Sequence, residues 1–211
     1  MVFISDKVRN MNIRAIGFDY GGVIEGSPGS VFEKGVGDIL GVNRELFKKV
    51  YFENNFLVNT GKLTWNEFWK KVLAELGKTE KTSEFFEFLK NQPTPKINED
   101  MMRLISRLKS RGYKVGILSN NSIEKAQKIR SSEIAKYFDT MVFSEETGHM
   151  KPQPEIFEVF IKNLEIKMEE LAFVDDTEQS LKTAKEIGFH PVLFVGYENL
   201  VKDLQFLGIE L

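Results

Sequence analysis

Short, continuously apolar segments alternate with residues at helical spacing through the second half of this chain. The apolar segments are Val115–Leu118, Met141–Phe143, Leu171–Val174 and Val192–Val195. Strand-length runs without polar alternation are typical of strands that helices cover on both faces. Helical periodicity occupies residues 101–108, 156–164 and 178–187, and the last of these closes at Gly188. This alternation predicts an α/β fold built on a mostly parallel sheet.

One earlier strand and one long helical region complete the predicted organisation. The strand lies near Ile13–Phe18 and ends abruptly at Asp19. Residues 27–95 show helical periodicity without a convincing strand, and they end at a proline-marked boundary. We therefore predict a core of residues 1–26 and 96–211, with an all-helical unit of residues 27–95 inserted after the first strand.

The predicted insertion is rich in aromatic residues. They are Phe32, Phe47, Phe52, Phe56, Trp65, Phe68, Trp69, Phe85, Phe86 and Phe88. This density suits either a ligand-binding box or the core of a small helical bundle. We favour the bundle's own core, because Trp65, Phe68 and Trp69 fall on one helical face.

Composition excludes several classes of protein. The 211 residues carry 29 Lys and Arg against 31 Asp and Glu, a formal net charge of −2, and no Cys. This balance argues against nucleic-acid binding by phosphate neutralisation, and the lack of Cys excludes disulfides and thiolate chemistry. Residues 1–10 lack the apolar core of a signal peptide, and no stretch is long enough to cross a membrane. We expect a cytoplasmic protein that binds neither nucleic acid nor membrane, with its oligomeric state open.

Four polar features follow predicted strands, where open parallel sheets build their sites. Asp19 lies just before two glycines, Gly21 and Gly22, whose backbone N–H groups can approach a ligand closely, although an Asp that caps the turn would also explain this pattern. Ser119 offers a hydroxyl suited to an oxyanion, although a helix N-cap is the simpler role. Lys151, before Pro152, could point inward from an ordered loop or be an ordinary surface lysine.

The fourth feature is the acidic pair Asp175-Asp176, which ends an apolar strand. Such a pair attracts a hard cation such as Mg²⁺, although Thr177 or Asp176 as a helix N-cap would also explain the pattern. If the strands of Asp19 and Asp175 are neighbours, three carboxylates converge and repel unless cations compensate them. Lys151 and one Mg²⁺ supply three positive charges, which leaves a near-neutral pocket for a phosphate. The combination predicts phosphoryl transfer.

These stretches resemble the four motifs of the haloacid dehalogenase-like hydrolase superfamily, in the family's order and across nearly the whole chain. The stretches that resemble the first and second motifs are Asp19-Tyr-Gly-Gly-Val23 and Leu118-Ser-Asn120. Those that resemble the third and fourth motifs are Lys151-Pro-Gln-Pro-Glu-Ile-Phe157 and Val174-Asp-Asp-Thr177. The insertion resembles the small helical cap typed C1. The resemblance implies a Rossmann-like core with helices on both faces, in which the Asp19 strand lies between the strands of the second and fourth motifs.

The resemblance also implies roles. Asp19 would be the nucleophile of a Mg²⁺-dependent phosphatase that acts on a small phosphorylated metabolite such as a sugar phosphate, and Lys151 would neutralise charge. The implied metal ligands are Asp19, the Gly21 carbonyl, Asp175 and Asp176. The implied substrate-binding residues are Ser119, Asn120, Tyr20 and Gly21.

One departure from the family pattern concerns Gly21. Family phosphatases usually carry a second Asp at this position, which protonates the leaving oxygen, and glycine has no side chain to do so. Either substrates with easily expelled leaving groups are favoured, or Glu25 or a side chain of the insertion supplies the proton. Two further alternatives stay open: a metal-free haloacid dehalogenase, and a non-catalytic relative that binds a metabolite or a protein.

Overall fold

Five parallel strands form one sheet in the computed structural model, which describes residues 12–26 and 29–211. The strand order is β3-β2-β1-β4-β5. The strands are β1 (Ala15–Phe18), β2 (Lys114–Ser119), β3 (Thr140–Phe143), β4 (Leu171–Asp175) and β5 (His190–Leu193). The predicted parallel sheet is confirmed, with β1 between β2 and β4. The expectation for residues 1–10 and the predicted start of the insertion at residue 27 lie outside the residues that the structure describes.

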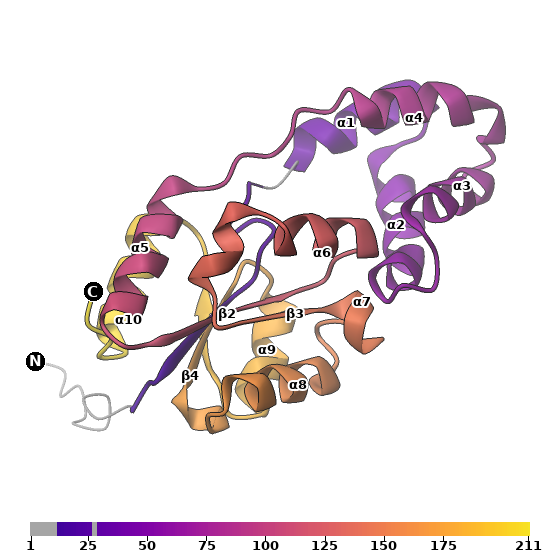
Figure 1. Cartoon of the computed structure of the whole chain (residues 1–211). Coiled ribbons are helices and arrows are strands. Elements are labelled where there is room, and N and C mark those ends of the chain that lie inside the picture. Colours follow the sequence, from indigo (N-terminus) through magenta and orange to yellow (C-terminus); the bar gives the residue numbers. More distant parts are fainter. Residues whose placement is uncertain (1–11, 27–28) are drawn as a thin grey trace, which may run out of the picture.

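Helices cover both faces of the sheet (Figure 1). One face packs against α5 (Glu99–Ser110), α6 (Ile123–Arg130) and α10 (Tyr197–Phe206). The other packs against α8 (Pro154–Leu164) and α9 (Glu178–Glu186). The predicted helical stretches match α5, α8 and α9, and their periodic apolar residues are buried as expected. Helices α6 and α10 were not predicted from the sequence.

The centre of the sheet packs closely on Phe160 of α8. A Cβ atom on Gly17 would lie 2.6 Å from the Phe160 ring, and one on Gly116 would lie 2.7 Å from it. Glycine at both positions therefore lets the ring sit directly on β1 and β2. This packing holds α8 against the two strands that carry Asp19 and Ser119.

The last strand lies two residues earlier than predicted. β5 is His190–Leu193, and its pairing with β4 begins at His190 opposite Ala172. The apolar run Val192–Val195 extends beyond the strand, since Val195 is 64% exposed. The strand itself begins with His190 and Pro191, which are not part of that run. Proline is tolerated there, since an edge strand leaves one side of its backbone unpaired.

Four helices between β1 and α5 form a bundle with a hydrophobic core of its own. They are α1 (Gly29–Leu40), α2 (Arg44–Asn59), α3 (Trp65–Glu75) and α4 (Thr82–Lys90). As predicted, aromatic residues build much of this core, and Phe47, Phe68, Trp69 and Phe85 are almost fully buried. We call these four helices the helical bundle.

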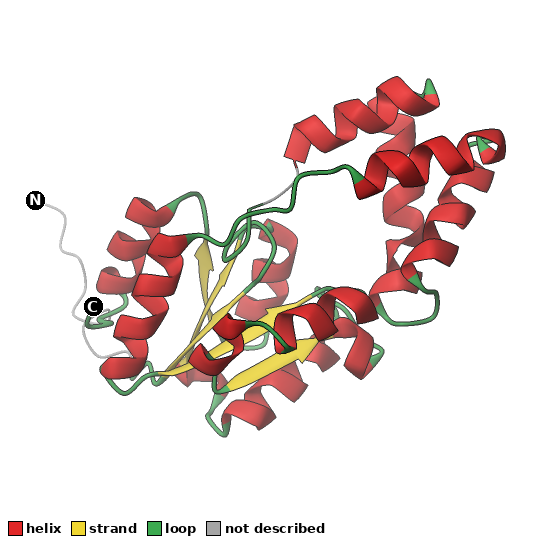
Figure 2. Cartoon of the chain, turned by 45° about the horizontal axis from the view of Figure 1, so that its top comes forward, coloured by secondary structure: helices red, strands yellow, loops and turns green. Residues whose placement is uncertain are grey.

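Two linkers join the helical bundle to the rest of the molecule: the first is described up to Gly26, and the second is residues 91–98. Where they leave the core, residues 24–26 and 96–98 lie side by side (Figure 2). The Gly26 amide donates to the Lys96 carbonyl at 3.0 Å, and the Asn98 amide donates to the Ile24 carbonyl at 2.8 Å. On its far side the bundle contacts α6, where the Trp65 amide donates to Glu124. The bundle therefore meets the core on two sides.

The described part of the chain contains no helix long and apolar enough to cross a membrane.

The remaining helical pieces of the described residues are short. They are α7 (Ser144–Thr147) and three 3-10 turns, Thr79–Lys81, Glu133–Tyr137 and Met168–Glu170.

Candidate active site

Side chains from four distant segments meet at the carboxyl edge of the sheet. Asp19 follows β1, Ser119 ends β2, Asp175 ends β4, and Lys151 lies in the loop between α7 and α8. The Ser119 hydroxyl donates to Asp19 Oδ1 at 2.6 Å. Lys151 Nζ lies 3.0 Å from the same oxygen and 2.5 Å from Asp175 Oδ2. The predicted convergence of these four residues is present.

Asp19 is the centre of this arrangement. Its backbone amide donates to the Val174 carbonyl at 2.8 Å, which holds the residue between β1 and β4. Its Oδ1 also accepts the Tyr20 amide hydrogen at 2.6 Å, whereas Oδ2 has no hydrogen-bond partner among the described residues. Burial, reinforced by Asp175, raises the pKa of Asp19 although Lys151 and Ser119 oppose the shift. One carboxylate oxygen is thus fixed, and the other stays available.

Lys151 is held by its backbone as well as by its ammonium group. The Asn120 side chain accepts from the Lys151 amide at 2.8 Å and donates to the Lys151 carbonyl at 2.9 Å. Burial alone would lower the pKa of Lys151, but the Asp19 and Asp175 carboxylates outweigh it and raise the pKa. Lys151 is therefore a buried cation that an ordered loop points inward, and the surface-lysine alternative is wrong. Contact of Asn120 with a substrate stays a prediction.

The third carboxylate, Asp176, lies against the turn after Asp19. A Cβ atom built on Gly22 would be 2.2 Å from Asp176 Oδ2, and Gly22 has a φ of +79°. Only glycine leaves room for this approach without strain. Burial, and then Asp175, raise the pKa of Asp176. Carboxylate oxygens of Asp19, Asp175 and Asp176 lie within 4.8 Å of one another.

The helix-cap role considered for Ser119 falls to a neighbouring residue, and the one considered for Thr177 or Asp176 falls to Thr177. Ser122, not Ser119, is the N-cap of α6, and its hydroxyl accepts the Lys125 amide hydrogen. Thr177 is the N-cap residue of α9, and its amide donates to Asp175 Oδ1 at 2.8 Å. The Asp175 carboxylate thus supports the start of α9 while its other oxygen faces Lys151.

The turn from Tyr20 to Gly26 borders the site. Tyr20 is buried, and its hydroxyl donates to Glu25 at 3.2 Å. Burial, and then the Glu25 charge, raise the pKa of the Tyr20 phenol above its ordinary value, so the hydroxyl remains a donor. Gly21 is exposed, and apart from its two chain neighbours no described residue lies within 4 Å of a Cβ placed on it.

Sequence reasoning missed Lys125. Its ammonium group lies 2.6 and 2.8 Å from the two carboxylate oxygens of Glu25 and 5.3 Å from the centre of the Tyr20 ring. The two partners are 100 residues apart in the chain. No local pattern signals such a pair, and only the packing of α6 beside the turn creates it.

The fold and the sequence both match known proteins. The structure is similar to a HAD family enzyme from Bacteroides thetaiotaomicron, with a TM-score of 0.70, 22% identity, and coverage of 89% of this chain and 96% of that one. The chain is 27% identical over 177 residues to glyceraldehyde 3-phosphate phosphatase from Pyrococcus furiosus, covering 83% of this chain and 70% of that protein.

A mouse relative is much longer than this chain. Acyl-CoA dehydrogenase family member 10 from Mus musculus is 28% identical over 205 residues, which are 92% of this chain and 19% of that protein. The chain therefore spans about a fifth of the length of this relative. The family model of haloacid dehalogenase-like hydrolases matches residues 13–188. The chain belongs to the haloacid dehalogenase-like hydrolases, a family of enzymes with phosphatases among this chain's relatives.

Proposed function

We propose that this hydrolase is a Mg²⁺-dependent phosphatase of small phosphorylated metabolites, including sugar phosphates, and that it acts through a phosphoaspartyl intermediate on Asp19. The observation that carries the proposal is the cluster of three carboxylates with Lys151 and Ser119 at one sheet edge. The phosphatase activity in the printed name of the Pyrococcus furiosus relative supports the substrate class.

The donor set fits a Mg²⁺ ion. All of its side-chain ligand atoms are carboxylate oxygens, which hard divalent cations prefer. Three carboxylates and the Lys151 ammonium leave two negative charges, the charge that one divalent ion balances. Asp19, Asp175, Asp176 and the Gly21 carbonyl would hold the ion. When bound, it would neutralise negative charge on the phosphoryl oxygens.

The residues of the chain divide the chemistry between them. A carboxylate oxygen of Asp19 attacks phosphorus, the bond from phosphorus to the leaving oxygen breaks, and that oxygen takes the electron pair. Water then attacks the phosphoaspartyl group, releasing phosphate and restoring Asp19. Ser119 and Lys151 orient Asp19, and Lys151 offsets the charge that develops on the phosphoryl group. Phosphoryl contacts by Tyr20, Gly21 and Asn120 belong to the same proposal.

We also propose that the helical bundle is a C1-type cap. This assigns residues 1–26 and 96–211 to the hydrolase core and residues 27–95 to the cap. The adjacent linkers and the Trp65–Glu124 contact support this division, because they join the bundle to the turn after β1 on one side and to α6 on the other.

A screen of about a hundred phosphorylated metabolites with Mg²⁺ tests the function. We expect turnover that EDTA abolishes and that Asp19→Asn lacks, with a trapped phosphoenzyme in the unsubstituted protein only. Turnover of haloacids that survives EDTA would instead identify a metal-free dehalogenase. No hydrolysis of any phosphate in the panel would indicate a binding protein.

A further inference from the structure

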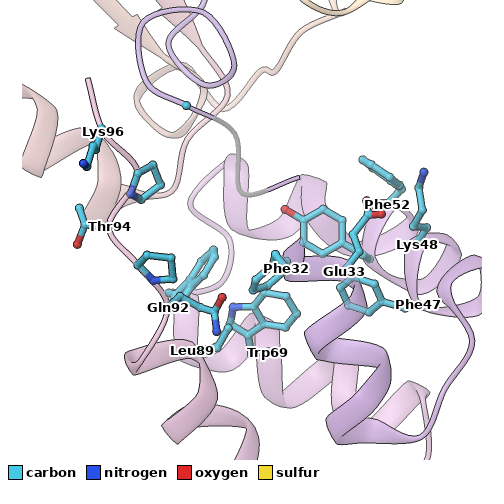
Figure 3. A pocket seen from close by; sticks show the side chains of 15 residues that line it. Phe32, Glu33, Phe47, Lys48, Phe52, Trp69, Leu89, Gln92, Thr94 and Lys96 are labelled. Atoms are coloured by element: carbon cyan, nitrogen blue, oxygen red, sulfur yellow. The ribbon is translucent and has the colours of Figure 1, made fainter. Parts of the chain in front are cut away.

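A cavity of about 800 Å³ lies between the helical bundle and the two linkers (Figure 3). Most of its wall is aromatic or apolar. The aromatic residues that line it are Phe32, Phe47, Tyr51, Phe52, Trp65 and Trp69. Pro93 and Pro95 of the second linker close one side. A volume of this size and an apolar wall are typical of a site for a small molecule.

The bundle's own packing does not use all of this aromatic surface. Trp69 and Phe47 are buried and stack with their planes 6° apart, so they form a rigid floor. Phe52, by contrast, is 60% exposed, and Trp65 is 38% exposed. The indole nitrogen of Trp69 is one of two buried side-chain polar atoms without a hydrogen-bond partner in the described part of the chain. Packing within the helical bundle accounts for the buried floor of the cavity but not for the exposed rings of Phe52 and Trp65.

The rim of the cavity carries positive charge. Lys48 and Lys96 line it, and neither has an ion-pair partner within residues 12–26 and 29–211. Glu33 also lines the cavity, but its carboxylate is already paired with Arg44. The rim therefore complements an anionic molecule with an apolar body.

A tight turn connects the cavity with the nucleophile. Gly26 lines the cavity and follows Glu25, whose amide donates to the Tyr20 carbonyl at 2.9 Å. Tyr20 in turn follows Asp19. The wall of the cavity and the carboxylate cluster thus share one short turn. A substrate with its phosphate at Asp19 would have to extend its leaving group along Gly21 to reach the rings.

On the basis of the phosphatase function proposed above, we infer that this cavity binds an aromatic leaving group and that the preferred substrates are aryl phosphate monoesters. Two independent features agree on this class. The exposed rings of Phe52 and Trp65 offer stacking partners for a flat group. Gly21 has no side chain to protonate a leaving oxygen, and a phenolate departs more readily than an alkoxide.

The reaction balances with water as the only other reactant. The Asp19 carboxylate forms a bond to phosphorus, the bond from phosphorus to the aryl oxygen breaks, and the phenolate carries away the electron pair before water protonates it. An alkyl phosphate would release a strongly basic alkoxide at the same step. The aromatic cavity and the missing acid therefore select for the same substrate.

The first experiment separates ring binding from leaving-group reactivity. We would measure kcat/KM for 2-naphthyl phosphate, phenyl phosphate, acetyl phosphate and dodecyl phosphate with Mg²⁺. Naphthyl and phenyl esters leave with similar ease but differ in ring area, so we expect about a tenfold preference for the naphthyl ester. Phe52→Ala should lower the ratio of naphthyl to acetyl phosphate turnover about 3–10-fold through KM.

Phe206→Ala is a matched control. Phe206 of α10 is also 60% exposed but lies outside the cavity lining. The ratio should stay unchanged in this variant. Because both phenylalanines are largely exposed, neither substitution should prevent folding.

A binding measurement gives a readout that does not depend on turnover. The chain has two tryptophans, and both line the cavity. In Asp19→Asn, 4-nitrophenyl phosphate should quench their fluorescence saturably, and Asp19→Asn/Phe52→Ala should bind it more weakly. N-acetyltryptophanamide corrects for absorption by the ligand.

The outcomes distinguish the two proposals. Turnover of acetyl phosphate without a naphthyl preference, or with dodecyl phosphate preferred, would overturn the aryl inference and leave the phosphatase function standing. No turnover of any of these four compounds alongside turnover in the metabolite screen would also overturn the aryl inference alone, and no turnover in either assay would remove the phosphatase function as well. Saturable quenching with a Phe52-dependent naphthyl preference supports the inference.

Discussion

The ammonium nitrogen of Lys151 lies 2.5 Å from a carboxylate oxygen of Asp175, and both side chains are buried. The same nitrogen lies 3.0 Å from Asp19. Taking one member from a buried charge group leaves the others uncompensated, which is far more costly than losing a surface pair. The protein's stability and its proposed chemistry therefore depend on the same lysine.

Lys151→Met should lower both stability and activity. Two buried carboxylates would lose their cation, which costs about 3–5 kcal/mol of the free energy of unfolding. Loss of the charge that stabilises the phosphoryl group should lower kcat about 10²–10³-fold. Denaturant unfolding and phosphatase assays measure the two effects. Added MgCl₂ should raise the Tm of this variant more than that of the unsubstituted protein, and an equal rise would contradict a shared cation site.

Gly22→Ala should disturb Asp176. Its Cβ would lie 2.2 Å from Asp176 Oδ2, so the carboxylate must move, and we expect the Mg²⁺ concentration for half-maximal activity to rise about tenfold. The positive φ adds about 1–2 kcal/mol of destabilisation. Gly112→Ala is the control, because Gly112 has a φ of +88° and no described neighbour within 4 Å of its Cβ position. An unchanged Mg²⁺ requirement in Gly22→Ala would argue against Asp176 as a ligand.

Gly21→Asp should accelerate the poorest leaving groups most. The position is exposed and has space for a side chain, so an added carboxyl group can reach the leaving oxygen. General acid catalysis supplies up to about 10²–10⁴-fold, and we expect part of this for alkyl phosphates and little for aryl phosphates. Gly21→Asn has nearly the same shape without the acid. Equal rates for the two variants would show that the carboxyl group does not act as an acid.

Glu25→Ala tests the alternative source of a proton. The Glu25 carboxylate is ion-paired with Lys125 and accepts the Tyr20 hydroxyl hydrogen, so it holds the turn and is poorly suited to donate a proton. We expect the rate to depend steeply on the leaving group in the unsubstituted protein, and the slope to be unchanged in Glu25→Ala. A rate that hardly depends on the leaving group in the unsubstituted protein, but depends steeply on it in Glu25→Ala, would identify Glu25 as the acid.

Local patterns in the chain were enough to predict most of the fold. Apolar runs without polar alternation indicated four of the five strands near their observed places, since both faces of a parallel sheet are buried. The apolar-run criterion predicted β5 two residues too late, because an edge strand can begin with residues such as His190 and Pro191. Helices α6 and α10 were also not predicted, although α10 carries Leu200, Val201 and Leu204 at helical spacing.

The site, like the fold, could be predicted only where a local pattern in the chain signals it. Asp19, Ser119 and Asp175 were recognisable because each stands at the end of an apolar strand, and Lys151 because it lies in a proline-marked loop. Parallel strands bring such ends to one edge of a sheet. Packing between distant segments set the rest: the pairing of Lys125 with Glu25, the approach of Asp176 to Gly22, and the cavity that leaves Phe52 and Trp65 partly exposed. Helical periodicity identifies an apolar face, but how much of that face its neighbours cover depends on the relative placement of helices in three dimensions.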